Sequence, residues 1–160
     1  MIKILFVCLG NICRSPMAEG MFTQMVIKEN LQEKIHIESR ATSTWEHGKP
    51  PHPETRKILD RIGAKHHHMK SMTIQASDFV KFDYIIGMDK SNVQHLLKQA
   101  GKHKHKIFLL RNIMDETKGQ SVPDPYLTGQ YEQTYQLLEE SLTGWLERLK
   151  NELQFKENLY

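Results

Sequence analysis

The chain has 160 residues, of which 39% are hydrophobic, enough apolar material for one ordinary core. The formal net charge is +3, and no basic stripe with interleaved aromatic residues is present, which argues against a nucleic-acid partner. The apolar run at 2–9 is too short to span a membrane, and no other stretch is suited to it. We therefore expect a single domain over residues 1–160 that is cytoplasmic, without a membrane partner, and monomeric or weakly homodimeric.

Strand and helix patterns alternate along the chain. The nearly continuous apolar run Ile2–Val7 predicts a strand buried on both faces, and Pro16 fits the first position of a following helix whose apolar residues recur at helical spacing. The later expected elements are a strand at 35–39, a glycine- and proline-rich loop at 45–53, a helix at 54–62, a strand at 82–87, a helix at 89–100, a strand at 107–110 and an amphipathic helix over 131–153. This alternation predicts an α/β fold with a doubly wound parallel sheet and helices on both faces.

The segment Cys8–Ser15 follows the first strand and opens the first helix. Ligands of such sheets bind beyond the carboxyl ends of the strands, where this loop lies. The backbone N–H groups of Leu9 to Arg14 can curl around one anion, and Gly10 and Asn11 tolerate the left-handed backbone that the curl needs. The loop therefore predicts a phosphate-binding site.

Two side chains of this loop carry reactive chemistry. Arg14 can fork two hydrogen bonds onto two phosphate oxygens, and the same positive field favours the nucleophilic thiolate form of Cys8. The Ser15 hydroxyl either stabilises that thiolate or caps the helix, and both roles are compatible. Both cysteines of the chain lie in this one segment, so a disulfide framework is not expected.

A phosphate ester also needs an acid to protonate its leaving group. A tyrosine phenolate has a conjugate acid with a pKa of about 10 and leaves poorly without a proton. Asp124 lies between Pro123 and Pro125, which stiffen its loop, and Tyr126 follows as a flat wall. The alternative is an ordinary Asp-Pro turn, which the cysteine loop makes less attractive. Asp89 is assigned to capping of the helix at 89–100.

The segments Val7–Pro16, Tyr84–Asp89 and Asp124–Tyr126 resemble the low-molecular-weight protein-tyrosine phosphatases, and the resemblance spans nearly the whole chain. It implies a three-layer, flavodoxin-like fold with four parallel strands, no metal or other cofactor, tyrosine-phosphorylated proteins as partners and a phosphocysteine intermediate. It also implies catalytic roles for three residues: nucleophile Cys8, phosphate clamp Arg14 and general acid Asp124.

The resemblance implies two further groups of site residues. Asn11, Ser15 and Ser39 form the network that holds the loop, while Trp45 and Tyr126 form the walls of a deep slot that suits phosphotyrosine better than the shorter phosphoserine. The other reading of Trp45 is a hydrophobic anchor for its loop. The predicted substrate-binding residues are Leu9, Gly10, Asn11, Ile12, Cys13, Ser15, Trp45 and Tyr126, with Ser39 as loop support.

The sequence departs from the family pattern in a few places. Leu127 stands where many members have a second tyrosine, and Arg40 follows Ser39 where small residues are usual. Arg40 would either attract acidic residues around a phosphotyrosine or be a solvated surface charge, and the second is favoured. The family often has a histidine beside its network, for which residues 66–68 compete. We otherwise expect this histidine run to be a solvated surface and not a metal site.

Three rival functions share this fold or this pocket. An arsenate reductase would need resolving cysteines beyond Cys13, which are absent, and a phosphoarginine phosphatase usually has a threonine where this loop has Ile12. A non-catalytic phosphoprotein-binding module would be expected to lack Cys8 or Asp124. We also advance the hypothesis that peroxide links Cys8 to Cys13 in a reversible disulfide, the alternative being that Cys13 only packs against the sheet.

Overall fold

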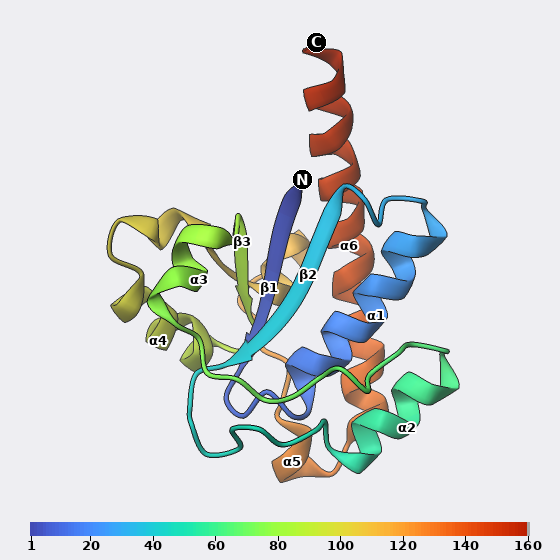
Figure 1. Cartoon of the computed structure of the whole chain (residues 1–160), viewed down its shortest axis with the longest axis vertical. Helices are drawn as coiled ribbons and strands as arrows, with labels where there is room; N and C mark the ends of the chain where they lie inside the picture. The colour runs from blue at the N-terminus through green and yellow to red at the C-terminus, as the bar shows by residue number, and fades with distance from the viewer. Residues whose placement is uncertain (160) are drawn as a thin grey trace.

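A computed structural model describes residues 1–159 and shows a four-stranded parallel sheet with helices on both faces (Figure 1). The strands lie in the order β2-β1-β3-β4, and their bounds are β1 (Ile2–Cys8), β2 (Ile35–Ala41), β3 (Tyr84–Gly87) and β4 (Ile107–Leu109). From β1 the chain continues to β2, which pairs with one edge of β1, and it later returns to β3, which pairs with the other edge of β1. The predicted doubly wound α/β fold is confirmed, with its topological switch point between β1 and β3.

The two faces of β1 pack against different helices. Ile4 and Phe6 belong to a core shared with helix α1 (Arg14–Lys28) and helix α6 (Tyr131–Asn158). Leu5 belongs to a second core on the other face, shared with α3 (Ala76–Lys81) and α4 (Lys90–Ala100). Because successive side chains of a strand point to opposite faces, a strand covered on both sides needs an unbroken apolar run.

Several boundaries differ from the sequence predictions. Helix α1 begins at Arg14, so Pro16 lies at its third position, where a missing backbone N–H costs no helical hydrogen bond. Strand β2 continues to Ala41, and β3 begins at Tyr84. Helix α3 was not predicted, because six residues are too few to show a helical period.

The remaining elements lie around these layers. Helix α2 (Pro53–Arg61) packs beside α1, and α5 (Pro125–Thr128) is a single turn near the loops that follow β1 and β2 (Figure 1). Three 3-10 helices flank β4 along the chain: η1 (Gly101–Lys106) precedes it, and η2 (Leu110–Ile113) and η3 (Asp115–Thr117) follow it. Helix α6 projects past the sheet toward the C-terminus (Figure 1). No helix within residues 1–159 is long and apolar enough to cross a membrane.

Backbone hydrogen bonds join the loops at the carboxyl ends of the strands. The N–H of Thr42, just after β2, donates to the carbonyl of Cys8 at 2.9 Å, and the N–H of Val122 donates to the carbonyl of Met88 at 2.9 Å. These bonds bring the loop after β1, the loop after β2 and the segment before α5 to one edge of the sheet. Segments more than a hundred residues apart thus build one site.

Candidate active site

The loop between β1 and α1 turns its carbonyl oxygens outward onto protein donors. The carbonyl of Leu9 accepts from the N–H and hydroxyl of Ser43, and the carbonyl of Ile12 accepts from the N–H of His52 at 2.8 Å. Within residues 1–159, four amide hydrogens of this loop have no protein acceptor, namely those of Leu9, Gly10, Ile12 and Cys13. A loop with its acceptors occupied and its donors free suits an anion.

Asn11 holds the loop in this shape. Its backbone is left-handed, with a φ of 55°, as the sequence predicted. Its side-chain amide donates to the hydroxyls of Ser15 and Ser39 at 2.8 and 2.9 Å, and its side-chain oxygen accepts from the N–H of Met72 at 3.1 Å. One buried side chain therefore ties the loop to α1, to β2 and to the segment before α3.

The sulfur of Cys8 lies at the start of this loop. The Ser15 hydroxyl is 3.0 Å from Cys8 Sγ, and the N–H of Asn11 donates to the same sulfur at 3.3 Å. Ser15 already accepts from Asn11, so its own hydrogen can point either at the sulfur or at the carbonyl of Arg40, which is the more distant of the two at 3.5 Å. The capping role considered for Ser15 is wrong, because the N-cap position is Cys13, and no side chain caps that end.

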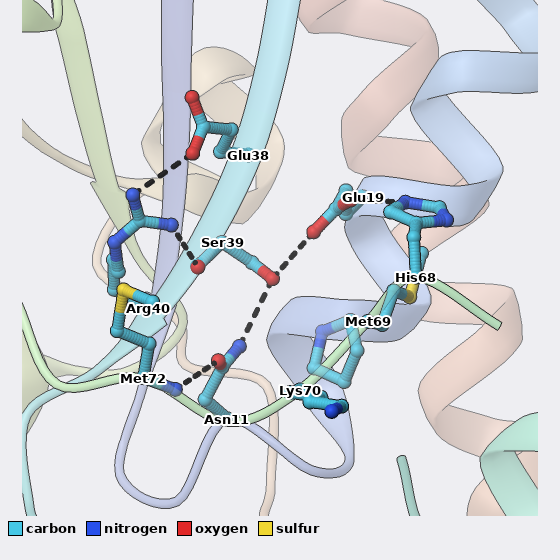
Figure 2. Close-up of a pocket in the computed structure, with 10 residues that line it drawn as sticks. Asn11, Glu19, Glu38, Ser39, Arg40, His68, Met69, Lys70 and Met72 are labelled. Carbon is cyan, nitrogen blue, oxygen red and sulfur yellow. Dashed lines mark hydrogen bonds and ion pairs between the residues drawn. The ribbon is translucent and has the colours of Figure 1, made fainter. Parts of the chain in front are cut away.

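A chain of polar groups continues behind the loop, as Figure 2 shows. The Ser39 hydroxyl donates to Glu19 at 2.6 Å, and Glu19 reaches the ring of His68, where the two atoms are 3.4 Å apart. Burial raises the pKa of Glu19, against the lowering effect of these two partners. Of the three candidate histidines, His68 is therefore the one beside the network, while His66 is buried against Asp60 rather than solvated as expected.

Arg14 is the buried cation of the site, with only 2% of its surface exposed. Its guanidinium donates to Asp89 at 2.6 Å and to the carbonyl of Val122 at 3.0 Å, and it lies 3.6 Å from Asp124. Burial alone would lower its pKa, but Cys8 and the two carboxylates raise it, so the charge is retained. The Nε of Arg14 is a buried donor without an acceptor among the described residues.

Asp124 enters the site from the segment before α5. Its carboxylate accepts from the N–H of Tyr126 at 3.0 Å and caps the short helix, with Pro125 at the first position. Asp124 therefore forms the Asp-Pro turn and also places its carboxylate near Arg14. Asp89 caps α4 as predicted, but it also pairs with Arg14, which the sequence analysis missed.

These residues surround a cavity of about 210 Å³. Its lining contains most of the predicted site residues together with two that were not predicted, Glu46 and Leu127. Asn11 and Ser15 lie behind the loop and do not line it. Trp45 is 74% exposed at the cavity edge, which contradicts its reading as a buried anchor and agrees with a wall. The lining comprises Cys8, Leu9, Gly10, Ile12, Cys13, Arg14, Trp45, Glu46, Asp124, Tyr126 and Leu127.

Arg40 is neither a solvated charge nor part of this cavity. Its guanidinium donates to Glu38 at 2.8 Å and lies 3.4 Å from Asp78, so two carboxylates neutralise it. It lines a separate cavity of about 300 Å³ behind the loop, together with Glu19 and His68 (Figure 2). Glu38 lies two residues before Arg40 on β2, whereas Asp78 lies on α3, so only the packing of α3 beside β2 places the second carboxylate at Arg40.

The network residue Glu19 also escaped the sequence analysis. It is the one charged side chain in the turn Met17–Gly20, among residues that are otherwise apolar or small. A lone carboxylate on the buried side of a helix is unusual without a partner, and this was the available signal. Its partners Ser39 and His68 lie 20 and 49 residues away, so spacing could not reveal them.

Comparison with known proteins identifies the family. A model described as low molecular weight phosphotyrosine protein phosphatase matches residues 3–155. The chain is 40% identical over 155 residues to the low molecular weight protein-tyrosine-phosphatase YfkJ of Bacillus subtilis (strain 168). The matched region covers 96% of this chain and 99% of that protein. A crystal structure of YfkJ matches with a TM-score of 0.91 over 95% of this chain and 96% of that one. The chain belongs to the low molecular weight phosphotyrosine protein phosphatase family.

Two further solved structures show the range of this fold. The low molecular weight protein tyrosine phosphatase SP-PTP of Streptococcus pyogenes is 43% identical, with a TM-score of 0.81 over 96% of this chain and 98% of that one. The Drosophila arginine phosphatase DARP is 34% identical, with a TM-score of 0.84 over 93% of this chain and 98% of that one. Because proteins named for two different substrates share the fold, the substrate must be argued from the pocket itself.

The hydrogen bonds around Glu38 predict how the stability of the fold depends on pH. Burial alone would raise the pKa of Glu38, but hydrogen bonds with Lys81, His36 and Arg40 lower it from 4.5 to about 2. Since the folded pKa lies below the unfolded one, this carboxylate stabilises the fold above pH 4.5 and loses that effect as the pH falls toward 2. Glu38→Gln should therefore reduce the unfolding free energy at about pH 6 and by a smaller amount at about pH 3. Urea unfolding of both proteins measures this, and a pH-independent difference would contradict it.

Proposed function

We propose that this chain hydrolyses phosphotyrosine monoesters through a phosphocysteine intermediate, with Cys8 as nucleophile, Arg14 as phosphate clamp and Asp124 as general acid. One observation carries the proposal: unpaired loop amides and the unpaired Nε of Arg14 surround a thiol at one cavity. A buried donor without an acceptor is costly, and a phosphate oxygen would relieve that cost. Membership of the family supports the same assignment.

The reaction follows from the positions of these groups. The Cys8 thiolate attacks phosphorus while the bond from phosphorus to the tyrosine oxygen breaks, and the protonated Asp124 gives its proton to the departing oxygen. Water then attacks the phosphocysteine, Asp124 takes a proton from that water, and phosphate and the thiolate are released. Ser15, 3.0 Å from the sulfur, favours the thiolate both as attacking and as leaving group.

The cavity walls favour an aromatic ester. Trp45 lines the cavity from the loop after β2 and Tyr126 from helix α5, and Ile12 adds an apolar side chain. A tyrosine ring can fill the space between these side chains and bring its phosphate to Cys8, whereas phosphoserine is too short to use them. Phosphoarginine would bring a polar guanidinium against the apolar side chain of Ile12. Burying a polar group against an apolar one costs free energy.

The proposed function also bears on the partners and location of the protein. Tyrosine-phosphorylated proteins are the proposed partners, which the family name of the relatives supports. Cytoplasmic location, a single domain over residues 1–160, a monomeric or weakly dimeric state, and function without nucleic acid, metal or cofactor stay predictions. An arsenate reductase route through further resolving thiols is disfavoured, because the chain has only two cysteines.

The nucleophile can be tested by trapping the intermediate. Cys8→Ser should lower hydrolysis of an aryl phosphate by roughly 10⁴-fold or more, because a serine hydroxyl is far less ionised than a thiol. Rapid acid quenching with labelled substrate should leave the phosphoryl group on wild-type Cys8 and none on the variant. Near-normal turnover by Cys8→Ser would refute the proposal, and tight phosphate-ester binding with no turnover by the wild type would indicate a binding module.

The general acid can be tested by changing the leaving group. Asp124→Ala should slow hydrolysis by roughly 10²–10⁴-fold, and the loss should be larger for phenyl phosphate than for p-nitrophenyl phosphate, whose more acidic phenol leaves without help. Steady-state kcat/KM for both esters gives the ratio. An equal loss for both would mean that Asp124 only shapes its loop. Asp124→Asn serves as the matched control, because it keeps the size and the cap but has no proton of suitable acidity.

We also propose that peroxide converts Cys8 to a sulfenic acid, which the Cys13 sulfur attacks with release of water to form a disulfide. Both thiols are free and line the same cavity. Burial raises the pKa of Cys13 to about 12, so the disulfide should form faster as the pH rises toward that value. Peptide mass spectrometry at two pH values measures the linkage. Only sulfinic or sulfonic Cys8 in the wild type, as expected for Cys13→Ser, would exclude it.

A further inference from the structure

Large apolar side chains are exposed around the opening of the catalytic cavity. Leu127 is 82% exposed, Tyr126 61% and Leu9 38%, and the exposed Trp45 completes the group. All four line the cavity that has Cys8 in its wall. We call these four residues the apolar mouth. Exposed apolar groups gathered at one opening are typical of a binding surface, whereas single exposed apolar residues need no explanation.

The charges near the apolar mouth are already paired. Within residues 1–159, Arg14 is the only cation in the cavity lining, and Asp89 holds it. Glu46, at the cavity edge, is bound by Lys49 at 2.6 Å. Arg40, for which attraction of acidic substrate residues was the less favoured interpretation, is neutralised by its own partners and lines another cavity. Among the described residues, the cavity lining therefore contains no cation without a carboxylate partner.

The apolar mouth is held by its surroundings. The N–H groups of Tyr126 and Leu127 donate to the side chain and the carbonyl of Asp124 at 3.0 Å each. The Tyr126 ring meets the ring of His52 edge to face at 6.1 Å, and His52 stacks on Tyr131 at 5.0 Å. The Tyr126 ring and the backbone of Leu127 thus have a fixed support, which reduces the entropy lost when a ligand covers this part of the mouth.

We propose that the apolar mouth binds an apolar residue next to the phosphotyrosine, so that preferred substrates carry aliphatic or aromatic rather than acidic neighbours. This rests on the proposed function, which places the phosphate at Cys8 and the tyrosine ring between Trp45 and Tyr126. The residue before or after the tyrosine then emerges at the opening, beside Leu127 and Leu9. Covering those side chains removes apolar surface from water, whereas an acidic neighbour would lose hydration without gaining a cation.

Three phosphotyrosine peptides test this inference. They share one sequence and differ only in the residues on either side of the phosphotyrosine, which are leucine, serine or aspartate. Wild-type kcat/KM should be roughly threefold to tenfold higher for the leucine peptide than for the serine peptide, and lowest for the aspartate peptide. Leu127→Ser should bring the leucine-to-serine ratio close to one. Val80→Ser, which removes a similarly exposed apolar side chain on α3, is the matched control and should keep the wild-type ratio.

The outcomes separate the inference from the proposed function. Hydrolysis of all three peptides at equal rates, a preference for aspartate, or an unchanged ratio in Leu127→Ser would overturn the role of the apolar mouth while leaving a tyrosine phosphatase. Failure of the wild type on every peptide and on phenyl phosphate would instead overturn the function itself. Because Leu127 is exposed, Leu127→Ser should fold normally, and an unchanged melting temperature checks this.

Discussion

The side chain of Asn11 fixes the loop on which the rest of the site depends. Asn11 lies in the loop between β1 and α1 and has a left-handed backbone conformation. Its side-chain amide forms hydrogen bonds with Ser15, Ser39 and the backbone of Met72. These bonds are made by the protein's own groups, and they align the amides of the loop. A binding site arranged before the ligand arrives avoids the cost of ordering itself at the moment of reaction.

The buried charge of Arg14 is the second constraint. A guanidinium with so little exposure requires partners, and Asp89 and Asp124 supply them from the ends of two separate segments. Their distances differ, 2.6 Å for Asp89 and 3.6 Å for Asp124. The closer carboxylate accepts a hydrogen bond from the guanidinium, while the other makes only a longer ion pair. The two acids beside Arg14 therefore contact it differently.

The two cysteines of one loop have opposite environments. The sulfur of Cys8 has two hydrogen-bonding partners, the Ser15 hydroxyl and the N–H of Asn11. Cys13 lies close to Tyr131, 3.5 Å from its hydroxyl, and burial raises the pKa of its thiol to about 12. The two sulfurs therefore have different surroundings, a difference that their separation by five residues in the sequence does not reveal.

The amino-acid sequence alone determined the α/β fold and singled out the loop Cys8–Ser15 and Asp124 as site candidates, because each depends on local order: apolar runs, the left-handed backbone that Asn11 tolerates, and proline spacing. It could not determine which histidine joins Glu19, that Asp89 holds Arg14, or that Asp78 pairs with Arg40. It also gave no sign that Glu46 lies at the cavity, and it marked Leu127 only as a departure from the family pattern. Those relations join side chains from separate elements, and only the packing of the helices on the sheet brings them together.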